Sequence, residues 1–111
     1  MRIKVIGDDS ISRQARAYAE YRLFAALSQV LDTDRVRNAS LVLGRAKSRR
    51  YCDGVVCTMT VELNGGGVTR LRTFGEHPYA AINRAVERFR LNWRPERHDP
   101  SHPHREMVAT E

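Results

Sequence analysis

Cysteine is scarce in this sequence, and the two cysteines that occur lie close together. Cys52 and Cys57 are the only ones among 111 residues. Their separation matches neither a zinc-binding motif nor a thiol–disulfide exchange motif. If residues 55–63 form a strand, Cys57 faces the interior and serves as a small hydrophobic residue. We therefore expect no disulfide and no metal site at these cysteines, as is usual for thiols in the cytosol.

Long apolar segments are missing as well. The first residues include Arg2 and Lys4, and the apolar run that they interrupt stops at Gly7, which is too early for a signal peptide. Elsewhere no run approaches the ~20 apolar residues that a membrane-spanning helix needs. These absences predict a cytoplasmic protein of bacterial type that has no membrane partner.

Residues that typically carry catalysis are few. No glycine-rich loop followed by Lys-Ser or Lys-Thr connects a predicted strand to a helix, so a phosphate-binding loop of that kind is excluded. His77 is the one histidine outside residues 95–111, and its place before Pro78 is explained by helix capping. The other histidines lie in a proline-rich segment that fixes no geometry for a metal: His98, His102 and His104. The sequence thus predicts no enzyme, no catalytic residue, no metal site, no cofactor and no small-molecule substrate.

Acidic residues and lysines are also in short supply. The chain has 19 Lys and Arg against 13 Asp and Glu, a net charge of +6, and Lys4 and Lys47 are its only lysines. Residues 1–94 carry 17 basic and 9 acidic side chains, a net +8, whereas residues 95–111 carry 2 and 4, a net −2. A small domain this basic is suited to a polyanion, with nucleic acid as the first candidate. Arginine offers phosphate a planar fork, although a genome rich in G and C produces the same arginine preference.

The sequence does contain an alternation of strand and helix patterns. Apolar residues at every second position predict strands, and apolar residues at spacings of three and four predict helices. Ser10 or Ser12 is the predicted N-terminal cap of the first helix. The resulting elements are strands at 1–6, 36–43, 55–63 and 68–74, and helices from that cap to about residue 31 and over 79–94. A loop at 44–53 and a glycine turn at 64–67 join the strands.

This order, β-α-β-β-β-α, predicts an α+β fold in the form of a two-layer sandwich. A right-handed crossover places the first helix over the first two strands, and the second helix returns to the same face. The expected sheet is four-stranded and mostly antiparallel, with both helices packed on one face. Residues 1–94 form this domain, and residues 95–111 are predicted to be a flexible, disordered tail because they hold almost no apolar side chains.

The fourth predicted strand breaks the alternating pattern. Val68 and Leu71 are three positions apart, so both cannot face inward in a regular strand. We therefore predict a bulge near Thr69–Arg70, with Arg70 and Arg72 on the open face of the sheet or at its edge. The polar residues predicted for that open face are Ser40, Thr58, Thr60, Glu62 and Thr69.

The last predicted helix divides its residues between an apolar face and basic ones. At ~100° per residue, Arg84 and Arg88 point roughly away from the apolar face, and Arg90 and Arg94 form a second row on one flank. The apolar face consists of Tyr79, Ile82, Ala85, Val86, Phe89 and Trp93. This helix is therefore expected to pack its apolar face into the core and to bind an acidic partner with its basic faces.

Four segments within residues 1–94 keep a characteristic order: IKVIG, ISRQARAYAEYRLFAAL, VCTMTVELNGG and PYAAINRAVERF. Together they resemble the ribosome hibernation-promoting factor and protein Y family of bacteria, in its short form. The most specific part is the run from Tyr79 to Arg88, which has Tyr, Ala, Ile and Arg in the family's spacing. The chain departs from the family's pattern at Ala25 and near Leu91, where basic residues are common.

The resemblance implies the same β-α-β-β-β-α fold and a protein that binds the small ribosomal subunit and its rRNA under stress. There it is expected to occupy the mRNA channel and the tRNA sites and so to inhibit translation. In the family, basic residues of both helices contact phosphates and sugars of rRNA. Arg16 and Arg22 match basic positions of the first helix, Arg88 matches one in the second, and Arg97 is the candidate for another just beyond it.

Adding the cations of the loop and of the two helix rows gives the predicted RNA-contact residues: Arg16, Arg22, Arg45, Lys47, Arg84, Arg88, Arg90, Arg94 and Arg97. The loop cations are equally explained by exposure to solvent. Two other functions stay open, namely a module for structured RNA in general and a protein-interaction domain in which Tyr21, Phe24 and Leu91 form a dimer patch. The isolated protein is expected to be monomeric, and its binding is compatible with paired ribosomes as well as single inactive ones.

Overall fold

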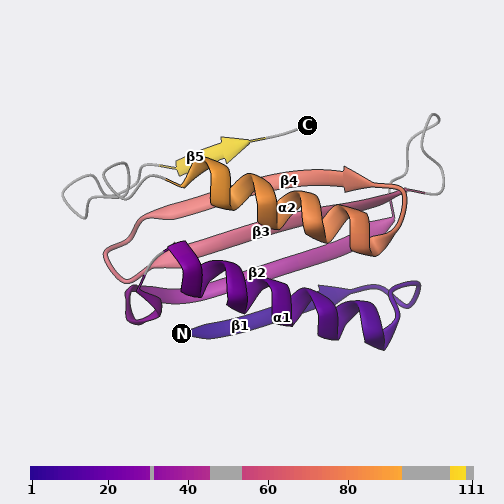
Figure 1. Cartoon of the computed structure of the whole chain (residues 1–111), viewed down its shortest axis with the longest axis horizontal. Helices are drawn as coiled ribbons and strands as arrows, with labels where there is room; N and C mark the ends of the chain where they lie inside the picture. The colour runs from indigo at the N-terminus through magenta and orange to yellow at the C-terminus, as the bar shows by residue number, and fades with distance from the viewer. Residues whose placement is uncertain (31, 46–53, 94–105, 110–111) are drawn as a thin grey trace.

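The structure is a computed structural model, and it describes residues 1–30, 32–45, 54–93 and 106–109. Its elements are β1 (Arg2–Gly7), α1 (Arg13–Val30), the short 3-10 helix η1 (Thr33–Arg35), β2 (Val36–Arg45), β3 (Val55–Leu63), β4 (Val68–Gly75), α2 (Pro78–Asn92) and β5 (Glu106–Ala109). Figure 1 shows α1 and α2 side by side on one face of a single sheet, and no helix of the described residues covers the other face. The two-layer arrangement is thus as predicted.

The sheet is mixed, and its strands lie in chain order, β1-β2-β3-β4-β5. β1 and β2 are parallel, as a connection through a helix allows. The pairs β2–β3 and β3–β4 are antiparallel, with a register shift between Val36 and Asn38 of β2. α1 packs on β1 and β2, and α2 packs on β3 and β4. These elements confirm the predicted α+β fold and its β-α-β-β-β-α order.

The fifth strand is an addition to the predicted sheet. β5 pairs in parallel with β4, so that Val68 lies opposite Glu106 and Leu71 opposite Ala109. A run of four residues is too short to show a strand period, so no pattern in the sequence predicts this strand. β5 falls within the segment predicted as a flexible tail, and the rest of that segment lies outside the described residues.

The core lies between the sheet and the two helices. β3 alternates between inward residues and half-buried ones along its whole length, as its sequence predicted. The bulkiest fully buried side chains of this core come from both layers and include Leu23, Leu27, Leu41, Met59, Ile82 and Phe89. Burial of each such side chain is worth roughly 1.5–3 kcal/mol relative to exposure. Cys57 is also buried here, which confirms its expected place in the core.

β4 is regular, and the bulge predicted near Thr69–Arg70 is wrong. Its pairing with β3 is unbroken along the strand. Thr69, predicted for the open face, is buried together with Thr73, while Val68 is only half-buried. The prediction failed because a threonine can face inward when its hydroxyl is bonded: Thr73 Oγ1 donates to the Ala81 carbonyl of α2 at 2.8 Å.

Both helices begin at residues that the sequence marked as caps. Ser12 Oγ accepts a hydrogen bond from the Ala15 N–H at 3.0 Å, and His77 Nδ1 accepts one from the Ala80 N–H at 3.2 Å. Each bond satisfies a donor that the helix itself leaves unpaired. Pro78 occupies the first turn of α2, where a missing N–H costs nothing.

The junction between β4 and α2 is very close. A Cβ atom on Gly75 would lie 2.4 Å from the Ala81 nitrogen and 2.9 Å from the Ala80 carbonyl carbon. Only glycine lets the backbone of the strand approach the first turn of the helix in this way. Gly75 therefore determines how close the start of α2 packs to the sheet.

Candidate nucleic-acid interface

Tyr18 fixes how the two helices sit beside each other. Its ring meets that of Tyr79 edge to face, with ring centroids 5.1 Å apart. Its hydroxyl donates to Asn83 Oδ1 at 2.6 Å. Ring pairs and hydrogen bonds of this kind contribute about 0.5–1.5 kcal/mol each. Because they join α1 to α2 near the start of each helix, they set the relative positions of the basic residues on the helical layer.

The two predicted arginines of α1 lie on different sides of the helix. Arg16 and Arg22 are six positions apart, which separates them by about 120° around the helix axis. The Arg16 guanidinium donates to the carbonyls of Gly7 and Asp8 at 3.1 and 3.0 Å, so it is turned toward the end of β1. Arg22 is half-buried, one turn beyond Tyr18 on the side facing α2. The structure therefore does not bring these two arginines together.

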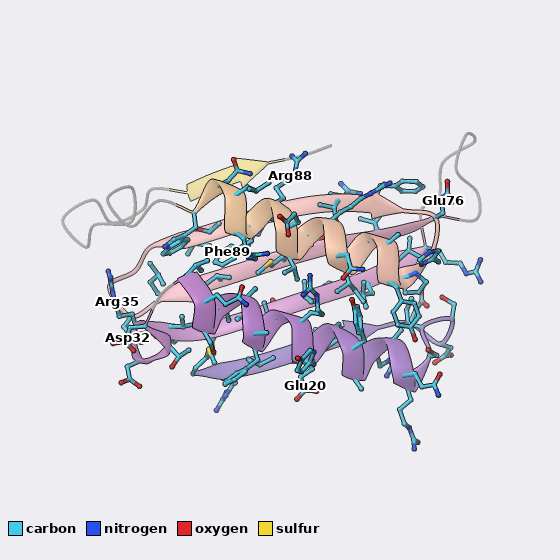
Figure 2. All side chains as sticks on the ribbon, viewed as in Figure 1. Glu20, Asp32, Arg35, Glu76, Arg88 and Phe89 are labelled. Carbon is cyan, nitrogen blue, oxygen red and sulfur yellow. The ribbon has the colours of Figure 1, made fainter. Side chains whose placement is uncertain are left out.

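The first basic row of α2 lies over β4. Arg84 Nη1 donates to the Phe74 carbonyl at the end of β4 at 2.6 Å. Arg88 follows one turn later and is half-buried. Figure 2 shows Arg88 on the side of α2 that faces away from α1. Both residues were predicted to lie roughly opposite the apolar face, and the bond to Phe74 shows that the guanidinium of Arg84 reaches back to the end of β4.

The second row of α2 lies on the flank facing α1. Asn83 faces α1, because it accepts a hydrogen bond from Tyr18 of that helix. Arg90 is seven positions later and so points in nearly the same direction around the helix axis. Arg90 pairs with Glu87 at 3.1 Å on the surface. Exposed ion pairs of this kind contribute about 0–1 kcal/mol to stability. Arg90 can therefore exchange Glu87 for another anion, such as a phosphate, at little cost. Arg22 and Arg90 are thus the predicted residues that flank the line between the two helices.

Arg45 lies away from the line between the two helices that Arg22 and Arg90 flank. It is exposed at the last position of β2, close to Asp8, whose pKa lies below its ordinary value. The main cause of that lower pKa is the hydrogen bond from the Ser10 side chain, followed by the Ser10 N–H, with a smaller contribution from Arg45. The remaining predicted contact residues lie outside the described residues: Lys47, Arg94 and Arg97.

The open face of the sheet is also basic, and sequence reasoning predicted only part of this. Arg70 and Arg72 of β4 are exposed there, as expected. Arg2 and Lys4 of β1 lie on the same face, because they alternate with residues that pack toward the core. The alternation of β1 and its crossover to β2 were both readable in the sequence, but the register that places Lys4 opposite Ser40 was not.

Large apolar side chains are exposed on the helical layer. Tyr21 and Phe24 of α1 are 69% and 52% exposed, and Leu91 of α2 is 65% exposed. Their exposure agrees with the position that the sequence analysis gave them off the apolar faces. The dimer patch proposed for them stays a prediction.

The described residues offer no sign of metal or thiol chemistry. Within them, no group of three or more His, Cys, Asp or Glu residues is placed to hold a metal ion. Burial raises the pKa of the Cys57 thiol to about 12, so its reactive thiolate form is scarce at neutral pH. In the same part of the chain, no helix is long and apolar enough to cross a membrane.

The fold and the distribution of charge define a small α+β domain with basic side chains on both of its layers. Among solved structures, a ribosomal subunit interface protein from Coxiella burnetii has the same fold, with a TM-score of 0.64. The match covers 82% of this chain and 91% of that protein, at 16% sequence identity. At this level of identity the likeness establishes a shared fold. No protein-family model matches the sequence, and a search of curated proteins finds no match.

Proposed function

We propose that this protein binds the ribosome as a member of the hibernation-promoting factor and protein Y family, and that it inhibits translation. The observation that carries the proposal is the shared fold with a protein described as a ribosomal subunit interface protein, over most of the length of both chains. The ordered sequence segments that resemble the same family also support it, since they are a property of the sequence and do not depend on the fold.

The proposed partner is the small ribosomal subunit and its rRNA. In this proposal the domain fills the mRNA channel and the tRNA sites, and inhibition is steric, with no covalent bond made or broken. Arg22 and Arg90 flank the line between the helices and supply cations to rRNA phosphates there. Arg84 and Arg88 supply a second group on the side of α2 nearer β4. Guanidinium groups suit this role because they bind phosphate through two donors at once.

The test is co-sedimentation with small ribosomal subunits at low and high salt. If about 6–10 phosphates are contacted, the affinity should fall by ~10³ to 10⁵ between 50 and 200 mM salt, a range taken from duplex DNA. The variant R22Q/R90Q should bind more weakly than the wild-type protein. The control is R13Q/R35Q, because it removes the same charge from two exposed residues that lie outside the proposed contacts. An absence of co-sedimentation at low salt would contradict the proposal.

A second candidate function is general binding of structured RNA. The observation in its favour is that cations occur on both layers of the domain and not on the helices alone. Domains with helices on one face of a sheet recognise double-stranded RNA by shape. Equal affinity for a plain RNA duplex and for small ribosomal subunits, measured at the same salt concentration, would favour this function over the first.

A further inference from the structure

On the open face of the sheet, β1 and β4 carry cations, and β2 and β3 between them carry mostly neutral residues. One row across it runs from Lys4 through Ser40 and Thr60 to Arg70 in the pairing register. Adjacent strands lie ~4.8 Å apart, so the two cations of this row are about 14 Å apart at their Cα atoms. Arg72 lies two positions beyond Arg70 on the same face of β4, about 6.8 Å along the strand.

Over β1 to β4 negative charge is scarce on this face, and beyond β4 the register places Glu106 of β5 opposite Val68. The described residues of β1 to β4 contribute Arg2, Lys4, Arg70 and Arg72 to it against a single carboxylate, Glu62. That carboxylate is itself engaged, since it accepts a hydrogen bond from Asn38 Nδ2 at 3.2 Å. The face is therefore complementary in charge to a polyanion, independently of the arginines on the helices.

The neutral strip between the cations has its own chemistry. Ser40, Thr58 and Thr60 carry hydroxyl groups that both donate and accept hydrogen bonds. Toward one end of the strip Val42 and Ile6, which lie opposite each other in the register, are exposed apolar side chains. The hydroxyl groups can bond base edges as well as phosphates, whereas the apolar side chains gain nothing from phosphate and match the faces of nucleobases.

A duplex cannot use both parts of this face. It would turn its phosphates toward the protein and keep most base edges within its stack, leaving the apolar residues against a charged surface. A single strand can place phosphates at the cations and turn its bases onto the strip, as strands do on other open sheets. The face therefore favours single-stranded over double-stranded nucleic acid.

We propose that the open face of the sheet is a second RNA-binding surface, specific for single-stranded RNA, with phosphates at Lys4, Arg70 and Arg72 and bases over Ser40 and Thr60. This surface is separate from the helical layer that the proposed function uses. The inference does not depend on ribosome binding, because it is tested on the free protein.

The experiment measures the fluorescence anisotropy of a labelled oligouridylate of about 12 nucleotides, a length within the site size of comparable surfaces. The variant R70Q/R72Q removes two proposed phosphate contacts. For single strands each contact contributes about 0.7 to the slope of log affinity against log salt, so the slope should become shallower by ~1.4. At 0.1 M salt this corresponds to about 25-fold weaker binding. The control R13Q/R35Q, with the same loss of charge elsewhere, should differ from the wild type by much less.

A gain of binding provides a second test that loss of folding cannot imitate. T58K adds a cation opposite Arg72, outside the two positions assigned to bases, and should tighten binding of the oligouridylate about 5-fold at 0.1 M salt, by the same relation. Thermal melting of each variant confirms that it is folded.

Several outcomes would overturn the inference. The first is an equal loss of binding in R70Q/R72Q and in the control, because the effect would then be one of net charge. The second is equal affinity for a duplex of the same length, and the third is equal affinity for vesicles of anionic lipid. Co-sedimentation of R70Q/R72Q with small ribosomal subunits, run in parallel, reports separately on the proposed function.

Discussion

Replacement of Gly75 by alanine should destabilise the protein more than any other glycine-to-alanine change in the described strands. The new Cβ would lie 2.4 Å from the Ala81 nitrogen, so the first turn of α2 would have to move away by about 1 Å to restore normal contact. That movement is opposed by the bond from Thr73 to the Ala81 carbonyl and by the bond from Arg84 to the Phe74 carbonyl. Overpacking of this kind costs about 1–3 kcal/mol.

Thermal unfolding followed by circular dichroism measures this cost. In a domain of this size 1 kcal/mol corresponds to a change in Tm of about 4–8 °C, so Gly75→Ala should lower Tm by roughly 4–24 °C. Gly44 of β2 is the matched control, because an added Cβ there meets nothing within 4 Å. Gly44→Ala should raise stability slightly, since alanine restricts the unfolded chain.

A substitution at Gly66 distinguishes the effect of a steric clash from the effect of backbone strain. It also has open space around its Cβ position, but its φ is +97°. Gly66→Ala should therefore cost about 1–2 kcal/mol through backbone strain alone. If Gly75→Ala melts at the same temperature as Gly44→Ala, the close contact between β4 and α2 does not limit packing, and the reasoning is refuted.

Three further predictions concern a thiol, a carboxylate and a helix contact. With the other cysteine replaced by serine, Cys57 should react with a thiol reagent only as fast as the protein unfolds, because burial raises its pKa to about 12; fast labelling of the native protein would contradict this. Ser10→Ala removes the main cause of the lowered pKa of Asp8, so the variant should be less stable than the wild type above about pH 4. This difference should vanish as the pH falls through the folded-state pKa, and urea midpoints at the two ends of that range check it. Tyr18→Phe keeps the ring contact but loses the hydrogen bond to Asn83, and should lower the free energy of unfolding by about 0.5–1.5 kcal/mol; an unchanged urea midpoint would show that this bond contributes nothing.

The features that the sequence predicted are those whose causes lie close together along the chain. The caps at Ser12 and His77 need only the residues of the following turn, and the alternation of β3 needs only its own side chains. The order of strands and helices follows from such local patterns, so the fold class was accessible without a structure. Most of the predicted apolar face of α2 is buried for the same reason, although Tyr79 at its start is exposed and Ala81, which was not predicted, is buried.

The predictions that failed depended on partners distant in sequence or on side-chain hydrogen bonds. Thr73 is buried because a helix carbonyl accepts its hydroxyl hydrogen, and no strand pattern contains that information. The direction of the Arg16 side chain also depends on such bonds, since it donates to the backbone at the end of β1, and its contact with RNA stays a prediction. Helical periodicity places a residue on a face, but it does not show which carbonyl a long side chain will reach. For the candidate interface, the sequence therefore identified basic positions more reliably than their directions.

The order of strands also determines which strands lie at the edges of the sheet, where backbone N–H and C=O groups have no neighbouring strand to pair with. In the described residues the outermost strands are β1 and β5, and the longer β4 is covered by β5. β1 is six residues long and carries Arg2 and Lys4. Short edge strands with charged side chains resist pairing with strands of other molecules, because such pairing would bring like charges together. The cations of β1 thus help to protect the protein from edge-to-edge aggregation, whatever else they bind.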